Sequence, residues 1–346
     1  MLYGELYTHH DCLIKEIQNK TNCKGNTVQR NDVLFPQSTT VDALSLISPA
    51  CLNVDTAETS GVFVIRPHKD IDGNFVAYYT KGNNYQRQKL SKKAQGLTIV
   101  HLYYQSIKDE TIAVPTFTEQ KRISTFFENL DNLITLHQRK LEKLSNVKKS
   151  LLEKMFPQKN STTPKVRFKG FTDAWEQRKV REAYKVTRGN VLAATKLSAN
   201  KSFENPYPVY SSQTKDNGLM GYYNQYLYHD AITWTTDGAN AGTVRFRKGK
   251  FYCTNVCGVL LSDTGLANKM TAEALNRIAW KYVSKVGNPK LMNNVMADIE
   301  FVMPSINEQN KISALFENLD NLITLHQRKL EKLKNVKKAL LEKMFV

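Results

Sequence analysis

The chain has 346 residues, of which 41% are apolar, so it is long and apolar enough for two or three domains that each bury a core. Its net charge of +17 predicts an acidic partner, and nucleic acid is favoured over membrane because no basic amphipathic anchor or lipidation signal is present. No apolar run approaches about 18 residues and the N-terminus lacks the order of a secretory signal, so we expect a cytoplasmic protein without a membrane span.

Residues 1–117 contain three segments rich in β-branched and aromatic residues, VFVIRP, NFVAYYTK and LTIVHLYY. Such segments are typical of short strands within a mixed domain. We expect an α+β globule here. Its 12 basic and 11 acidic residues leave almost no net charge.

Residues 123–156 and residues 312–345 are two copies of one segment, 189 positions apart, that differ at four of 34 positions. Apolar residues recur in both copies at alternating steps of four and three, which is the heptad pattern of a helix packed along another helix. We expect long helices at 118–156 and 305–346, in which the 34 repeated residues alone span roughly 51 Å at 1.5 Å per residue. Thr118 and Asn307 are the expected N-caps, and each is followed by Glu-Gln. The predicted helix–helix seam consists of Ile123, Phe127, Leu130, Ile134, His137, Leu141, Leu144, Leu151 and Met155, and of Ile312, Phe316, Leu319, Ile323, His326, Leu330, Leu333, Leu340 and Met344.

The order globule, helix, globule, helix suggests two like units related by a pseudo-two-fold axis, with the helices antiparallel and acting as a spacer. A coiled coil that only drives oligomerisation is the simpler alternative. His137 and His326, with Lys148 and Lys337, interrupt the seam in both copies, as polar residues that fix register do. For the histidines, a hydrogen-bonded seam position is favoured over a ligand or a proton relay.

Residues 157–164 (PQKNSTTP) predict a short linker, because they are polar and bracketed by prolines. Residues 165–304 then carry strand signals in PYPVYSSQ, GYYNQYLYHDAITWTT and GTVRFRKGKFYCTNVCGVLL, and a helical signal in TAEALNRIAWKYVSKV. We expect a second α+β globule. It holds 20 basic and 11 acidic residues, so a phosphate-contacting surface should be sought here first.

Side chains suited to DNA contacts cluster in three stretches of this globule, because Asn and Gln can pair with adenine, Arg and Lys with guanine, and Ser, Thr and Lys with phosphates. For each one, a solvated turn or a strand-edge charge is the alternative. The candidates are Ser211, Ser212, Gln213, Lys215, Asn217, Thr235, Thr236, Asp237, Asn240, Arg245, Arg247, Lys248, Lys250, Asn288, Lys290 and Asn293. Tyr222, Tyr223, Tyr226 and Tyr228 could stack on bases, but their alternating spacing favours strand packing.

Five scattered cysteines, Cys12, Cys23, Cys51, Cys253 and Cys257, predict reduced thiols rather than disulfides. A zinc site at Cys253 and Cys257 with His229 is considered, but FYCTNVCGVLL is more typical of a buried strand, so no metal is expected. Enzyme motifs are not found either. The segment from Asn205 to Pro208 lacks the consecutive prolines of an amino-methyltransferase, and the chain has neither a Gly-x-Gly-x-x-Gly loop nor an ATP-binding phosphate loop.

Several motifs in order resemble the specificity subunit of type I restriction-modification enzymes: the duplicated globule and helix, Pro115 or Pro304 followed by Glu-Gln, the helix start Ile-Ser-x-x-Phe-Glu-Asn-Leu-Asp-Asn-Leu-Ile, and RFKGFTDAWEQRKV. The resemblance implies that 1–117 and 165–304 are target recognition domains that each read one half of a split DNA sequence. It also implies that 118–156 and 305–346 form the antiparallel spacer. Methyltransferase and restriction subunits would dock on this chain and would bind S-adenosylmethionine, ATP and Mg, so the chain would be a non-catalytic subunit without a cofactor.

Three alternatives stay open at this stage. The first is a coiled-coil scaffold without DNA contact, and the second is a single-chain methyltransferase with an unrecognised active site. The third follows from Arg167–Val180, which have no counterpart before the first globule and suggest an N-terminally shortened, partly inactive first recognition domain.

Overall fold

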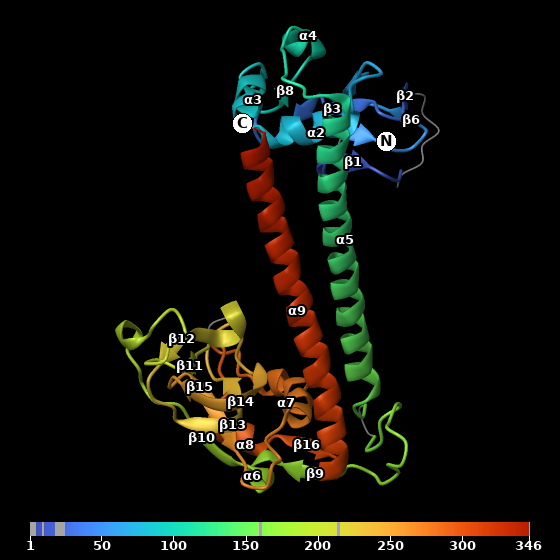
Figure 1. The fold of residues 1–346 in the computed structure, drawn as a ribbon. Coiled ribbons are helices and arrows are strands. Elements are labelled where there is room, and N and C mark those ends of the chain that lie inside the picture. The colour runs from blue at the N-terminus through green and yellow to red at the C-terminus, as the bar shows by residue number, and fades with distance from the viewer. Residues whose placement is uncertain (1–4, 9, 18–24, 159–160, 213–214, 346) are drawn as a thin grey trace. The chain divides into compact units, whose positions relative to one another are not determined.

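The computed structural model describes residues 5–8, 10–17, 25–158, 161–212 and 215–345. The chain forms two compact units, residues 1–141 with 326–346, and residues 142–325. Each unit contains one α+β globule and one part of both long helices, α5 (Phe117–Lys154) and α9 (Ile306–Met344) (Figure 1). Because the units divide both helices, they do not test the boundaries 1–117, 118–156, 157–164, 165–304 and 305–346, which stay a prediction.

The first unit is built on a four-stranded sheet of order β1-β5-β3-β7, in which β1 and β5 are parallel and the other pairs antiparallel. Two further strand pairs, β2 with β6 and β4 with β8, lie outside this sheet. The elements are α1 (Glu5–Thr8), β1 (Leu13–Ile14), β2 (Asn26–Gln29), β3 (Val33–Pro36), β4 (Ser38–Thr39), β5 (Ala50–Leu52), β6 (Thr56–Thr59), β7 (Val62–Ile65), α2 (Gly73–Gly82), α3 (Asn84–Ser91), β8 (Val100–His101) and α4 (Tyr104–Ile107).

The strand expected at NFVAYYTK is wrong, because this segment forms α2. Phe75 and Tyr78 have helical spacing and are both buried, with Tyr78 against Phe127 of α5 and Phe75 against Phe345 near the end of α9. The composition favours a strand, but packing against the two long helices decides for a helix. Of LTIVHLYY, only β8 and part of α4 are regular.

The second unit is built on a six-stranded sheet of order β10-β15-β13-β14-β11-β12. Its strands are antiparallel except for β11 and β14, and a separate pair joins β9 to β16. The elements are β9 (Glu176–Lys179), α6 (Val180–Ala183), β10 (Lys185–Arg188), η1 (Ala194–Lys196), β11 (Tyr207–Tyr210), η2 (Lys215–Gly218), β12 (Leu219–Tyr223), β13 (Tyr228–Thr235), β14 (Val244–Cys253), β15 (Cys257–Leu261), α7 (Lys269–Asn276), η3 (Ala279–Tyr282), α8 (Asn293–Asp298) and β16 (Glu300–Met303).

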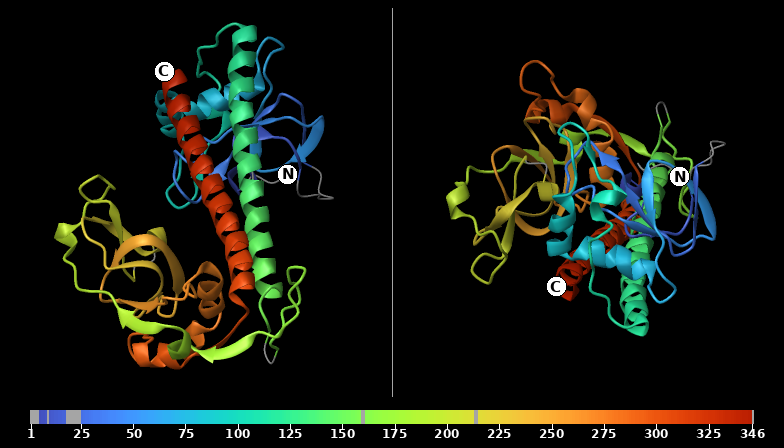
Figure 2. Two further views of the ribbon diagram at one scale, coloured as in Figure 1. Left: turned by 60° about the horizontal axis from the view of Figure 1, so that its bottom comes forward. Right: turned by 90° about the horizontal axis from the view of Figure 1, so that it is seen from above.

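The strand signals of this globule agree with β11 to β15, but FYCTNVCGVLL forms the end of β14 and the whole of β15 rather than one strand. The expected helix is shorter than predicted, since α7 ends at Asn276 and a 3-10 turn follows. Asn268 caps α7, and its side chain accepts a hydrogen bond from the Thr271 backbone at 3.1 Å. Figure 2 shows α7 between the sheet and α9.

The long helices begin at Phe117 and Ile306, within one residue of the predicted starts, but Thr118 and Asn307 lie inside them and are not N-caps. Thr116 takes that role in α5, where its hydroxyl accepts a bond from the Glu119 backbone at 3.4 Å. The predicted residues have the right chemistry but lie inside the first turn, where their backbone is already helical.

Within each unit the two helices are antiparallel and meet through aromatic pairs at equivalent repeat positions. Phe127 packs on Phe345 with ring centroids 5.7 Å apart, and Phe316 packs on Phe156 at 5.9 Å. Every residue of the predicted seam is buried or partly buried except Met344, which is 44% exposed. Phe345 is buried beside it instead.

The polar seam residues also find partners in the structure. The His137 and His326 Nδ1 atoms are 2.8 Å apart, so one ring donates a hydrogen bond to the other. Lys148 pairs with Asp320 at 2.7 Å in the second unit, and Lys337 pairs with Asp131 at 2.5 Å in the first. In both ion pairs the same lysine position of one repeat copy meets the same aspartate position of the other copy.

We predict that Phe316→Ala destabilises the second unit by about 3–5 kcal/mol, because the ring is fully buried between Phe156 and the globule core. Leu322→Ala on the same helix is the matched control, since Leu322 is 44% exposed and should cost far less. Urea unfolding of the full chain measures both. Equal losses for the two variants would contradict this packing.

The histidine pair predicts a pH dependence of stability. Burial, and then the neighbouring His326, Lys329 and Lys140, lower the pKa of His137 below its usual 6.5. The unfolded chain therefore binds this proton more readily, so the contribution of the neutral pair is present above about pH 6.5 and is lost as the pH falls below that value.

We expect the melting temperature of the wild type to fall between pH 7.5 and pH 5, as measured by circular dichroism in dilute buffer. His137→Gln should reduce this slope, whereas His229→Gln, which removes an exposed histidine, should keep it. An unchanged slope in His137→Gln would show that His137 does not contribute to the pH dependence.

Candidate nucleic-acid interface

The first turn of α9 holds the second globule in place. Arg167 donates two hydrogen bonds to Glu308, at 2.7 and 2.8 Å, and the Glu308 side chain is completely buried. Gln309 accepts a bond from the Asn268 side chain at 2.8 Å and donates to the Pro304 carbonyl. The Glu-Gln pair therefore anchors both the segment before β9 and the cap of α7, which packs on β14.

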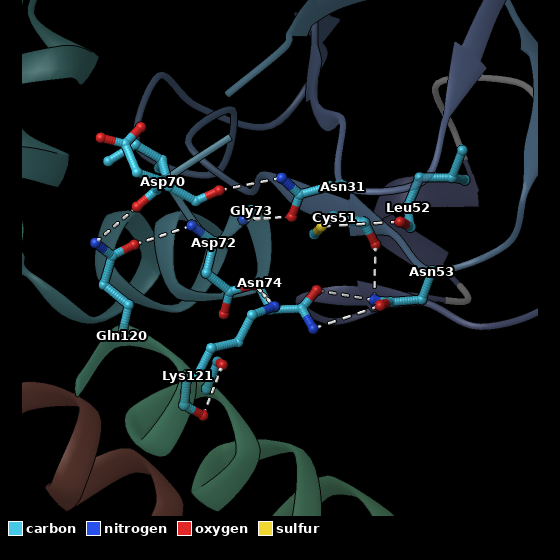
Figure 3. A network of polar contacts seen from close by, with 12 residues as sticks. Asn31, Cys51, Leu52, Asn53, Asp70, Asp72, Gly73, Asn74, Gln120 and Lys121 are labelled. Atoms are coloured by element: carbon cyan, nitrogen blue, oxygen red, sulfur yellow. Dashed lines mark hydrogen bonds and ion pairs between the residues drawn. The ribbon is translucent and has the colours of Figure 1, made fainter. Parts of the chain in front are cut away.

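The first unit uses the equivalent glutamine in the same way (Figure 3). The Gln120 side chain accepts a bond from the Asp72 backbone at 2.9 Å and donates to Pro115 and Asp70 carbonyls. Lys121 adds an ion pair to Asp72 at 2.7 Å. In both units, then, the glutamine near the start of the long helix holds the residue that precedes the docked globule helix, α2 or α7.

Charged side chains of both globules form ion pairs with side chains of the long helices. In the second unit, Lys269 of α7 pairs with Asp320 at 2.6 Å, and Glu273 pairs with Lys148 at 3.3 Å. In the first unit, the Lys337 and Asp131 pair meets Asp11, which also pairs with Lys81 of α2. The repeats thus present one Lys–Asp pair to two unrelated globules, and each globule supplies its own acid and lysine.

A small polar recess on the second globule brings together candidates from two of the three predicted stretches. It lies on one face of β13 and β14 beside the turn that joins them, and it has a volume of about 80 Å³. This is below the roughly 300–1,000 Å³ of small-molecule sites, so it suits a group presented from outside. The lining residues are Ser211, Asn217, Gly218, Thr233, Trp234, Thr235, Asn240, Thr243, Arg245, Arg247 and Cys257.

Trp234 lines the recess, but its ring packs into the core on the side of the sheet opposite to Thr233 and Thr235. Its ring lies so close to Gly258 that a Cβ there would come within 2.1 Å of it, so only glycine fits. The indole N–H donates to the Leu291 carbonyl at 3.1 Å, which ties the sheet to the 283–291 loop. The Trp234 side chain is fully buried.

Arg247 is part of the framework of the recess. It donates to the Thr233 hydroxyl at 3.1 Å and to the Asn217 carbonyl at 2.8 Å, and its guanidinium lies 3.7 Å from the centre of the Tyr210 ring. Burial lowers the pKa of Arg247 to about 10, so it stays charged at neutral pH. It clamps the 216–218 turn, where Asp216 and Asn217 have positive φ, onto the sheet.

The third predicted stretch lies beside this region. Leu291 donates its backbone N–H to Thr236, and Gly238 donates to Pro289. Lys290 pairs with Asp237 at 3.8 Å, while Asp237 also accepts a bond from the Thr236 hydroxyl at 2.6 Å. Thr236 is buried, so it supports the turn, whereas Asn288 and Lys290 are exposed.

The other candidates lie elsewhere or are occupied. Lys248 pairs with Glu317 of α9 at 3.0 Å, and Lys250 lies 4.5 Å from the centre of the Tyr226 ring. Asn293 donates to the Thr187 carbonyl at 3.4 Å. Ser212 is partly buried and does not line the recess. Gln213 lies outside the described residues, and Lys215 opens the short turn η2.

The four tyrosines differ in exposure, and the two neighbouring cysteines are both buried. Tyr226 is 40% exposed, so strand packing in the core is wrong for it, while Tyr222, Tyr223 and Tyr228 are partly buried. Cys253 and Cys257 are buried, and burial raises the pKa of both thiols, that of Cys257 to about 11. Cys23 lies outside the described residues. Among the residues described, no group of three or more potential metal ligands comes together.

Sequence reasoning missed the residues that shape the recess. Tyr210 and Trp234 occur in strand segments, and nothing in their spacing separates them from ordinary core residues. The alternation of Thr233, Thr235, Arg245 and Arg247 on paired strands was the available signal, because opposite residues of an antiparallel pair share a face.

A family model and several known proteins are similar to this chain, and their descriptions agree with one another. The model of the type I restriction modification DNA specificity domain matches residues 11–146 and 172–335. The N-terminal part of a type I specificity subunit from Mycoplasma pneumoniae is 37% identical over 142 residues, which cover 40% of this chain and 74% of that protein. The specificity subunit of the type I restriction enzyme MpnII from the same organism is 34% identical over 153 residues, 42% of this chain and 45% of that protein. The match thus spans less than half of the length of the MpnII subunit.

A crystal structure of the type I restriction-modification S subunit from M. genitalium has the same fold, with a TM-score of 0.71 at 15% identity over 96% of this chain and 88% of that chain. In the part of the chain that the structure describes, no helix is both long and apolar enough to cross a membrane. Since the two matched segments together span most of the sequence, the chain belongs to the family of type I restriction-modification DNA specificity domains.

Proposed function

We propose that this chain is the DNA-recognition subunit of a cytoplasmic type I restriction-modification complex, in which it reads a split target and leaves catalysis to companion subunits. The observation that carries the proposal is that two unlike globules dock on one duplicated helix platform through the same repeat positions. A protein that needed only one binding surface would have no use for two different heads on identical supports.

The second globule is the better-supported reading head. Its excess of basic residues favours contact with a phosphate backbone, which supplies most non-specific DNA affinity. Its recess, turn and 283–291 loop offer side chains of the kinds that contact base edges, among them Asn240 and Arg245. The first globule would read the other half of the target, and its near-neutral charge predicts a weaker electrostatic contribution.

The two long helices would form an antiparallel coiled coil related by a pseudo-two-fold axis, and this spacer would set the distance between the heads. Three paired contacts support this arrangement: the aromatic pairs and the ion pairs repeat at equivalent positions, and His137 meets its own repeat counterpart, His326. Such self-pairing is what a two-fold axis through the helix pair requires.

The helices also carry apolar side chains that are exposed to solvent. Methyltransferase subunits would dock on these side chains, and the restriction subunit would join the resulting complex. In each copy the flank of the seam is exposed to nearly the same extent, as expected for two equivalent docking surfaces. These residues are Leu133, Leu136 and Val147, exposed by 44%, 45% and 39%, and Leu322, Leu325 and Val336, exposed by 44%, 45% and 38%. S-adenosylmethionine, ATP and Mg would be held by the companion subunits.

The test is co-expression of this chain with its cognate methyltransferase, followed by base-resolution mapping of methylated adenines in the host DNA. We expect one split motif with a fixed number of unread bases, and purified complex whose DNA binding weakens steeply with salt. Methylation in the absence of the companion subunit would refute the non-catalytic role. DNA binding without any sequence preference would favour the scaffold alternative, and a motif with only one half would show an inactive globule.

The spacer proposal predicts that inserting one heptad into either long helix lengthens the unread gap. Seven helical residues add about 10 Å, or about three base pairs at 3.4 Å per step, and should leave both half-sequences unchanged. The matched control places the same seven residues in the 157–164 linker, where the gap should stay as in the wild type. A gap that does not change after insertion into a helix would rule out the spacer role.

A further inference from the structure

We propose that Arg245 is a base-reading side chain of the second globule and recognises a guanine, while Arg247 is a positioning residue that builds the recess around it. This assignment rests on the proposed function, because it names one contact within the DNA surface. The two arginines are two residues apart on β14 and share its face, yet the structure gives them different surroundings.

Arg247 is held in place by contacts inside the protein, which engage two of its five N–H donors and one face of its guanidinium. Its Nε donates to Thr233, one terminal nitrogen donates to the Asn217 carbonyl, and one face of its guanidinium covers the Tyr210 ring. A guanidinium held on an edge and a face in this way cannot turn towards a base without releasing the 216–218 turn. Its contribution is the shape of the recess.

The Arg245 side chain, in contrast, makes no hydrogen bond or ion pair with any residue that the structure describes. It is half-buried opposite Thr233 on the neighbouring strand, so its stem is held by the sheet while its guanidinium remains available. No aspartate or glutamate is among the recess-lining residues to neutralise it. Asp237, in the turn between β13 and β14, pairs with Lys290 and accepts a hydrogen bond from Thr236.

An unpaired guanidinium in a polar recess next to a basic surface suits an acceptor pair presented from outside. Guanine offers two such acceptors, O6 and N7, in the major groove, and arginine is their most frequent partner because its fork matches both. A phosphate also accepts from arginine, but the recess sets Arg245 among the amide and hydroxyl groups of Asn240 and Thr235, which can contact neighbouring base edges.

The experiment maps adenine methylation by the complete complex carrying Arg245→Gln or Arg245→Lys in this chain. We expect Arg245→Gln to lose about 5- to 150-fold of the preference for guanine at one position of one half-sequence, with the other positions, the other half and the gap unchanged. Arg245→Lys should keep part of that preference, because lysine can also donate to guanine. Equal melting temperatures of the variants and the wild type show that the globule is folded.

Two further variants separate the roles. Lys185→Gln removes an exposed basic residue of β10 that does not line the recess, and it should leave the motif unchanged. Arg247→Lys should lower the melting temperature and weaken every position of that half-sequence together, since lysine cannot make both hydrogen bonds and cover Tyr210.

Each contrary result has a distinct meaning. A motif unaltered in both Arg245 variants overturns the inference, and so does a uniform loss of methylation at all sites without a change of motif, which identifies a phosphate contact. In both cases the wild-type motif still stands and the proposed function survives. Only a wild-type complex without any split motif overturns the proposed function, and the inference with it.

Discussion

The structure of each unit depends on one constraint, which is that a single globule helix must pack against both long helices at once. In the second unit α7 meets this constraint through its cap on Gln309, its ion pairs to Lys148 and Asp320, and the contact of Arg277 with the Leu152 carbonyl and the Phe156 ring. The partly exposed ion pairs contribute little to stability on their own. The combined effect of all these contacts is orientation, since a helix held at its cap, middle and end has no freedom to rotate.

The same positions of the repeat perform this task on two globules with different sequences. Phe345 meets Phe75 and Tyr79 of α2, whereas its counterpart Phe156 meets Trp175 and Arg277. The repeat side supplies a ring, a lysine, an aspartate and a glutamine, which are common groups that many side chains can match. Two globules of different sequence match these groups here, each through one helix that carries a charged side chain to the contact. This explains physically how the helices can stay nearly identical while the heads diverge.

Elements that are repeated or strongly periodic could be predicted from the sequence. Elements whose conformation depends on tertiary packing could not. The long helices, the seam and the strands from β11 to β15 follow from local patterns, because amphipathic periodicity reports directly on burial. The helix α2 was missed because NFVAYYTK has strand composition and becomes helical only against Phe127 and Phe345. The N-caps were misplaced by two residues, a typical error since several neighbouring residues have capping side chains. Within the candidate site, Arg245 and Arg247 are equivalent in any pattern, and only the positions of Tyr210 and Asn217 distinguish them.

That distinction also explains how a recognition surface can change without loss of the fold. Arg247 loses solvation on burial, and its charge is retained because two hydrogen bonds and an aromatic face replace water, so removal of this side chain leaves the Asn217 carbonyl and the Thr233 hydroxyl without their partner. Arg245 has no such obligations inside the protein, and its replacement leaves no buried group unpaired among the described residues. The energetic cost of variation is therefore concentrated in the residue that does not read the ligand. A reading side chain on a supported strand face can then be exchanged at little cost in stability, provided that the clamp beneath it is kept.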